Sequence, residues 1–335
     1  MTNNPASSNR LGTESIGKLL RMYAVPGIIA MTASSLYNMV DSIYIGHIHD
    51  VGSLAISALA VTFPLMNLSA ALGTLVGVGA ATLISILLGQ KNYQASNKVL
   101  ANDVTMNCIV GLVFTVFCLL FLDPILTFFG ASANTLPFAR DYMKIILYGN
   151  IVTHLYFGLN SLIRSSGNPK LAMGLTLFTV IFNTILDPIL IFGFDMGIKG
   201  AAVATVISQT LALAYTLFYF TRKNNPIRLP RFIFGFDWRI AKESLAIGMG
   251  PFLMNSASCI VTMFINQQLL KYGGDLAIGA YGIVNRINFL FVMIIMGLNQ
   301  GMQPIAGYNF GARKYSRVKE VFTRTAKWAT LVSLF

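Results

Sequence analysis

Two aspartates stand alone in long apolar stretches of this sequence. Asp41 follows an uncharged run at residues 22–40, and Asp187 is the only charged residue in the segment 171–192. A carboxylate within the hydrocarbon of a bilayer costs roughly 2.5–3.5 kcal/mol even on lenient insertion scales, so it usually has a partner or a function there. The two aspartates therefore make ion-coupled transport the leading hypothesis.

Further oxygen ligands surround Asp187 in the sequence. Asn183 lies four residues before it, so the two share one face of a helix. Pro188 removes a backbone hydrogen bond and can leave a carbonyl oxygen free beside the carboxylate. Such hard oxygen ligands suit Na⁺, whereas two close carboxylates favour holding a proton instead. The structural alternative is that Asp41 caps a helix at the membrane interface and Asp187 is a turn residue at a kink.

The elements that position these residues are membrane-spanning helices. The chain has 335 residues, of which 55% are hydrophobic and 11% charged, against about 25% charged in a soluble domain. About 20 apolar residues suffice to cross a bilayer. The sequence predicts an all-α polytopic membrane protein in which a ninth span begins near Ser316. We predict eight complete spans at residues 18–45, 53–86, 101–122, 138–163, 169–192, 198–220, 244–270 and 276–309.

The charge distribution predicts the orientation of these spans. The net charge is +12, which by itself could suggest a nucleic-acid partner. With the N-terminus in the cytoplasm, however, most basic residues fall in cytoplasmic segments. The outer segments receive only Arg140, Lys144, Lys199 and Lys271. This asymmetry follows the positive-inside rule, so we expect a cytoplasmic N-terminus and no nucleic-acid partner.

The predicted depths bring the two aspartates together. The first and fifth spans both run outward, and Asp41 and Asp187 lie about four and five residues from their outer ends. At 1.5 Å per residue, both carboxylates are in the outer third of the membrane. Thr205 lies about seven residues into the sixth span, which runs inward, and so reaches the same level. We therefore expect one cation site built from three spans.

The basic segment 222–238 divides the chain. We expect an N-terminal six-helix lobe at residues 1–221, a cytoplasmic linker at 222–238 and a partial C-terminal lobe at 239–335. A shift of 222 residues aligns Gly52-Ser-Leu-Ala-Ile-Ser-Ala with Gly274-Asp-Leu-Ala-Ile-Gly-Ala, so the lobes are weak repeats related by an axis along the membrane normal. The last apolar run reaches Phe335 without a helix stop signal, which indicates C-terminal truncation.

Several motifs resemble the multidrug and toxic compound extrusion (MATE) family. They are the segments YNMVD at 37–41, LNSLIRSSGNPK at 159–170, NTILDP at 183–188 and GAAVAT at 200–205. The resemblance implies a two-lobe helical transporter. In the branch with a cation site in the N-terminal lobe, the coordinating positions match Asp41, Asn183, Asp187 and Thr205, which we take as a Na⁺ candidate site. Tyr37, Tyr142 and Asn160 match positions around that site.

This resemblance also implies a function. We expect an antiporter that exports organic, often cationic and amphipathic compounds in exchange for Na⁺ or H⁺ by alternating access. It would need no cofactor and would lie as a multi-pass monomer in a prokaryotic inner membrane. Arg286, near the middle of the eighth span, either lines the substrate cleft or bonds to nearby backbone. His154 either relays protons or packs, and the pair His47 and His49 is a weak metal motif.

Three rival functions remain open. A lipid-linked sugar flippase or polysaccharide exporter of the same superfamily would need a wide cationic cavity, and Arg286 is the visible intramembrane base. A membrane-embedded enzyme is disfavoured because the sequence has no His/Glu metal motif, nucleophile elbow or phosphate loop. A channel would conduct ions without saturable exchange of substrate.

Overall fold

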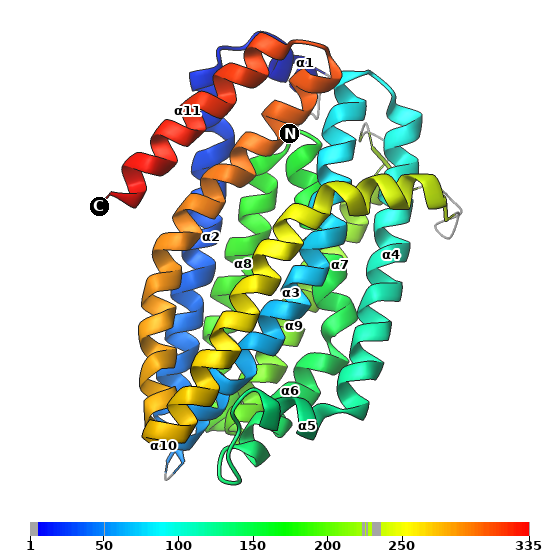
Figure 1. Ribbon diagram of the computed structural model, residues 1–335. Coiled ribbons are helices and arrows are strands. Elements are labelled where there is room, and N and C mark those ends of the chain that lie inside the picture. The colour runs from blue at the N-terminus through cyan, green and yellow to red at the C-terminus, as the bar shows by residue number, and fades with distance from the viewer. Residues whose placement is uncertain (1–5, 50, 223–224, 226, 230–235, 335) are drawn as a thin grey trace.

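The protein is a bundle of long helices in a computed structural model, which describes residues 6–49, 51–222, 225, 227–229 and 236–334 (Figure 1). No strand occurs within these ranges. The elements are α1 (Ala6–Thr13), α2 (Ile16–Gly46), α3 (Gly52–Gly89), α4 (Tyr93–Leu120), α5 (Leu122–Phe128), α6 (Leu136–Tyr148), α7 (Asn150–Ser165), α8 (Pro169–Pro188), the π-helical segment η1 (Ile189–Gly193), α9 (Ile198–Thr221), α10 (Trp238–Gly311) and α11 (Tyr315–Ser333).

Six of the described helices are long and apolar enough to cross a membrane, with η1 counted as part of α8. They are α2, α3, α4, α8, α9 and α10. The predicted all-helical membrane fold is therefore confirmed. Helix α11 begins at Tyr315, where the ninth span was predicted, but it is not among the six. Charged residues recur along it from Arg317 to Lys327, which lowers its hydropathy.

The predicted span 138–163 is wrong as a single helix. It consists of α6 and α7, which meet at Gly149. A side chain on Gly149 would overlap Val206 of α9, so the glycine allows close packing at this junction. Each of the two helices is too short to cross a bilayer alone, and together they provide the fourth crossing.

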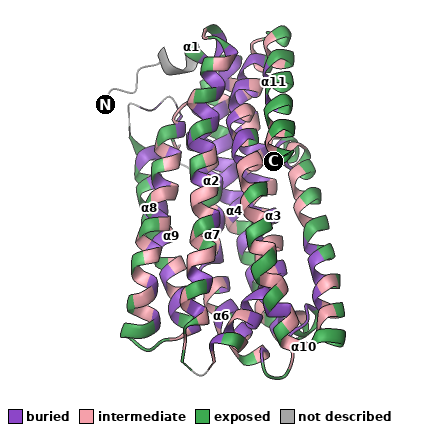
Figure 2. Ribbon diagram, turned by 90° about the vertical axis from the view of Figure 1, so that its left-hand side faces the viewer, coloured by how far each residue is buried: buried purple, intermediate pink, exposed green. Residues whose placement is uncertain are grey.

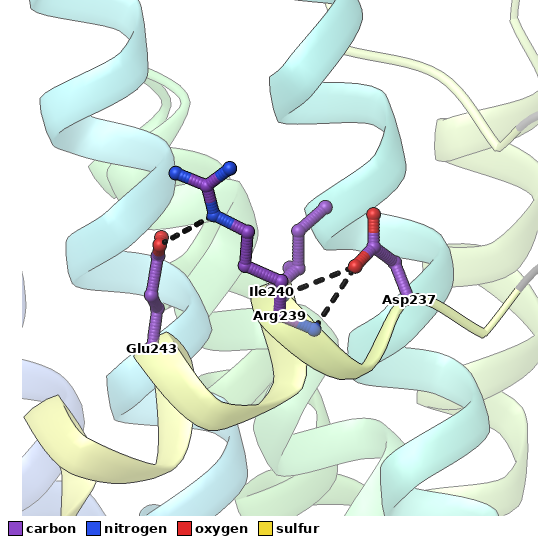
Figure 3. Close-up of polar contacts among 4 residues, drawn as sticks. All are labelled: Asp237, Arg239, Ile240 and Glu243. Carbon is purple, nitrogen blue, oxygen red and sulfur yellow. Dashed lines mark hydrogen bonds and ion pairs between the residues drawn. The ribbon is translucent and has the colours of Figure 1, made fainter.

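Helix α10 consists of two antiparallel arms, residues 238–273 and 275–311. Gly274, with φ 68° and ψ −167°, reverses the chain between them, in a conformation that favours glycine. The arms correspond to the seventh and eighth predicted spans. Asp237 caps the first arm, because its carboxylate accepts hydrogen bonds from the backbone N–H of Arg239 and Ile240 (Figure 3). An exposed Arg239–Glu243 pair, 3.4 Å apart, follows in the first turn.

Figure 1 shows α1 and α11 at one end of the bundle, hereafter the terminal end, and the turn between the α10 arms at the other, the far end. Exposed residues line the outward faces of the helices (Figure 2). On α4 these are apolar and include Leu112, Val113 and Val116. Apolar side chains on outward faces suit contact with lipid.

The α10 arms pack against α2 and α3 through glycines. The first arm approaches α3 so closely that a side chain on Gly248 would overlap the Leu75 carbonyl. The second arm approaches α2 at Gly297, which faces Gly27. Small residues at such interfaces let two helix backbones approach closely in a membrane. The helices before and after the predicted linker therefore pack directly on one another, while linker residues 223–224, 226 and 230–235 lie outside the described part of the chain.

Candidate functional site

Helices α2 and α9 meet through a hydroxyl pair near the far end. Tyr37 Oη lies 2.9 Å from Thr205 Oγ1. The Thr205 hydroxyl also donates to the carbonyl oxygen of Ala201 at 3.1 Å. Because threonine has one hydroxyl proton, Tyr37 is the donor in the pair. The Thr205 oxygen therefore lies at the contact between α2 and α9, where it accepts from Tyr37.

Helix α8 supplies an amide and a carboxylate to the same region. Asn183 Nδ2 donates to Asp187 Oδ1 at 3.0 Å, as their spacing on one helix face predicts. Both side chains are buried, and Asp187 is 0% exposed. Asp187 lies in the last turn of α8, directly before the π-helical segment η1. Such segments often occur at functional sites.

The two isolated aspartates lie close enough for their charges to interact. Asp41 is buried in α2, with 4% of its surface exposed. Tyr142 of α6 is also buried and interacts electrostatically with both carboxylates, as does Tyr37. The structure therefore brings together side chains from α2, α6, α8 and α9 that the sequence separates by up to 168 positions.

Three oxygen atoms in this cluster are buried without a hydrogen-bond partner. They are Asp41 Oδ1, Asn183 Oδ1 and Asp187 Oδ2. Buried polar atoms are normally paired, and an unpaired oxygen is costly. Carboxylate and amide oxygens are ligands that hard cations take, so the chemistry of the donor set fits the predicted ligand.

The second arm of α10 brings a positive charge to the same place. Arg286 Nη1 donates to the Asn38 carbonyl oxygen at 2.5 Å and to Ser42 Oγ. These two residues flank Asp41 on α2, and the Arg286 charge interacts with the Asp41 carboxylate. Arg286 thus ties the second arm of α10 to α2 beside Asp41. Sequence reasoning missed Ser42, although its position next to Asp41 was the available signal.

Arg286 also lines a narrow pocket between α3 and the two arms of α10. Its other lining residues are uncharged and include Phe63, Asn266 and Tyr281. The contact of Arg286 with the Asn38 carbonyl oxygen agrees with the alternative of a backbone-bonded arginine. A role of Arg286 in a substrate cleft stays a prediction.

The prediction that Asn160 adjoins the site is wrong. Asn160 Nδ2 donates to the Ala172 carbonyl oxygen at 3.1 Å, near the start of α8. Asp187 lies fifteen residues further along that helix, which is about 22 Å. The resemblance between motifs carried no information on which end of α8 Asn160 would reach.

The histidines have local roles. His154 Nε2 lies 3.0 Å from Ser69 Oγ in a buried contact between α7 and α3, and His47 bonds to the Ile43 carbonyl at 2.7 Å on its own helix. No group of three or more His, Cys, Asp or Glu side chains that could hold a metal ion occurs among the described residues. Asp50, which follows His49 in the sequence, lies outside them.

Comparisons with known proteins identify the family. The MatE family profile matches residues 26–189 and 246–335. The multidrug export protein MepA of Staphylococcus haemolyticus is 35% identical over 313 residues, covering 91% of this chain and 67% of that protein. MepA of Staphylococcus aureus strain N315 is 34% identical over 304 residues, covering 91% and 66%. The chain thus spans about two thirds of the length of these curated relatives.

Solved structures lead to the same family assignment. The MATE multidrug transporter DinF-BH superposes with a TM-score of 0.90 at 34% identity, covering 96% of this chain and 72% of that one. A transporter of the MOP superfamily from Pyrococcus furiosus shares the fold, with a TM-score of 0.88 at 22% identity over 100% of this chain and 73% of that one. The chain belongs to the MatE family and has the fold of MATE transporters.

Proposed function

We propose that this protein is a secondary active antiporter that exports organic compounds in exchange for Na⁺ or H⁺. The observation that carries the proposal is the buried cluster of unpartnered oxygens at Asp41, Asn183 and Asp187. Intramembrane carboxylates are costly and typically mark ion pathways. The names of the MepA relatives and of DinF-BH support multidrug compounds as the exported substrates.

In this proposal Asp41, Asn183, Asp187 and Thr205 bind the coupling cation, and Tyr37 and Tyr142 shape the site. Tyr37 holds Thr205 by donating to its hydroxyl oxygen. Carboxylate, amide and hydroxyl oxygens suit Na⁺, and the two interacting carboxylates could equally share one proton. Both cations neutralise the same buried charge. Transport driven separately by a Na⁺ gradient and by a pH gradient distinguishes them.

Arg286 provides the link between cation binding and helix movement. Without a cation, the Asp41 carboxylate attracts Arg286, which holds the second arm of α10 against α2. A cation at Asp41 weakens that attraction and favours separation of the two helices. Cation binding can shift the conformation in this way only because the two states then differ in affinity for the cation.

The uncharged lining of the pocket beside Arg286 favours this function over a lipid-linked sugar flippase. Its lining residues other than Arg286 are uncharged, and Arg286 itself is engaged with α2. The lining of this pocket therefore carries one positive charge, unlike the cationic surface that such a flippase would need. We also propose a multi-pass location in a prokaryotic inner membrane with the N-terminus in the cytoplasm, a monomeric state, and the lobe boundaries at residues 221 and 239.

The test is transport by the whole protein reconstituted in lipid vesicles. A panel of fluorescent organic cations is loaded, and a Na⁺ or a pH gradient is imposed separately. We expect one gradient to drive saturable substrate movement, with cation flowing the opposite way only when substrate is present. Cation flow without substrate would indicate a channel, and ion-independent movement of a lipid-linked sugar would indicate a flippase.

Replacing Tyr37 by phenylalanine tests the support given to Thr205. The change removes one hydroxyl that donates at 2.9 Å and leaves the ring in place. Because one neutral hydrogen bond contributes about 1 kcal/mol, we expect the coupling cation to bind roughly fivefold more weakly. The readout is the cation concentration that gives half-maximal export. Tyr148→Phe, at an exposed tyrosine on α6, is the control and should leave that concentration unchanged.

A further inference from the structure

A second buried carboxylate lies outside the cluster described above. Asp103 of α4 is 1% exposed, and both of its carboxylate oxygens are buried without a hydrogen-bond partner. None of the ion pairs between described residues includes it. It lies ten residues after Tyr93, about 15 Å along α4 from the terminal end. Asp41 and Asp187 lie near the far end instead.

Asn107 extends toward the same point as Asp103. It follows one helical turn later, and its Nδ2 donates to the backbone carbonyl of Asp103 at 2.9 Å. Its side-chain oxygen is buried without a partner. A Cβ on Gly158 of α7 would lie 2.6 Å from Asn107 Nδ2 and 3.0 Å from Asp103 Oδ2. The two side chains therefore converge on Gly158, where the missing side chain leaves room for them.

Few ionisable groups face this cluster. On α4, Cys108 interacts electrostatically with Asp103. On α7, His154 lies one turn from Gly158, and its Nδ1 is buried without a partner. Tyr156 and Arg164 of the same helix interact with each other.

The remaining neighbours add no countercharge. Helix α3 contains no acidic, basic or other ionisable residue, and it approaches Gly158 through Gly77. The start of α10 joins α4 through the backbone N–H of Asp237, which donates to Asn102 Oδ1 at 3.1 Å. The charged side chains Arg239 and Glu243 pair with each other at the surface, and Lys242 is exposed.

We propose that Asp103 and Asn107 form a second cation site, and that its ligand is a proton. A proton added to the Asp103 carboxylate gives a neutral carboxyl group, which can donate to Asn107 Oδ1. The amide oxygen is the acceptor in this pair, because the amide nitrogen has only N–H donors, one of which is bonded to the Asp103 carbonyl. One proton thus removes the buried charge and pairs two of the three unpartnered oxygens. A hard divalent cation takes six or more oxygen ligands, twice as many as these three side-chain oxygens provide.

Difference infrared spectroscopy of the whole purified protein tests this site, since a protonated carboxyl group has its own carbonyl stretching band. We expect a band that disappears as the pH is raised and that is absent in Asp103→Asn. Asp41→Asn and Asp187→Asn should leave this band in place. This measurement does not require transport. Failure of the Asp103 proposal is therefore distinguishable from failure of the proposed export function.

Two further measurements keep the proposal falsifiable. Asn107→Leu removes the acceptor but keeps Asp103, so the band should persist at a shifted frequency even if Asp103→Asn does not fold. An unchanged spectrum in Asp103→Asn or an unshifted band in Asn107→Leu would overturn the proposal. Loss of the band on adding Na⁺ at constant pH would show that a metal cation occupies the site, which also overturns it.

Discussion

Replacing Asp187 by asparagine is expected to reduce cation-driven export by at least about tenfold while the protein reaches the membrane at its normal level. Asparagine keeps the size of the side chain but removes its charge. A contact with a charged group contributes about 1.5–3 kcal/mol, which corresponds to a roughly 10–150-fold change in an equilibrium constant. Asp187 is 0% exposed, so water cannot replace the lost interaction. Export is measured in vesicles under the driving gradient, with expression followed by immunoblot.

The chain offers a matched control for this variant. Asp195 lies eight residues further on, is exposed, and has φ 53°. Asparagine tolerates that backbone conformation as well as aspartate does, so Asp195→Asn changes charge without changing the fold. It should export normally. Asp41→Asn should behave like Asp187→Asn, and wild-type export by both of these variants would disprove the proposed cation site.

Adding a single methyl group at Gly248 is expected to destabilise the protein by about 1–3 kcal/mol, the usual cost of overpacking. The first arm of α10 lies so close to α3 that a Cβ on Gly248 would overlap the Leu75 carbonyl oxygen. The contact is reciprocal, since a Cβ on Gly79 would overlap the Ser244 carbonyl. These are backbone atoms, so the two helices must move apart. Thermal unfolding of the purified Gly248→Ala protein measures the loss.

Gly250 provides the control two residues away on the same helix. A Cβ there would meet nothing within 4 Å, and alanine is intrinsically the better helix former by about 1 kcal/mol. We therefore expect Gly250→Ala to be neutral or stabilising, with a sign opposite to that of Gly248→Ala. Equal melting temperatures for the two variants would show that the α3–α10 contact does not limit stability.

The local part of the candidate site follows from sequence. Asn183 and Asp187 are one turn apart on an apolar helix, so their hydrogen bond is a consequence of helical geometry. The similar depth of Asp41, Asp187 and Thr205 follows from the fixed rise per residue and the alternating direction of the spans. The contact of Tyr37 with Thr205 and the interaction of Asp41 with Asp187 agree with that reasoning.

Contacts between distant helices could not be predicted in the same way. Arg286 meets Ser42 across 244 positions, and depth alone does not say which two helices are neighbours. Asn160 shows the converse, because a matching motif placed it at the site whereas packing placed it near the start of α8. Asp103 has no distinctive signal in the sequence, because a charge near the predicted end of a span is ordinary. Its isolation results from burial in α4 and from the packing of its carboxylate against Gly158 of α7.

Hydropathy and residue spacing are enough to predict a helical membrane protein with two isolated carboxylates at one depth. Hydropathy and helical spacing are properties of short segments, and these are sufficient for such conclusions. The unpartnered oxygens, the bonds of Arg286 and the close packing of α10 on α2 and α3 arise from the folded arrangement of the helices. These features depend on the relative rotation and contact of helices far apart in the chain. A single sequence does not encode such geometry in any local pattern.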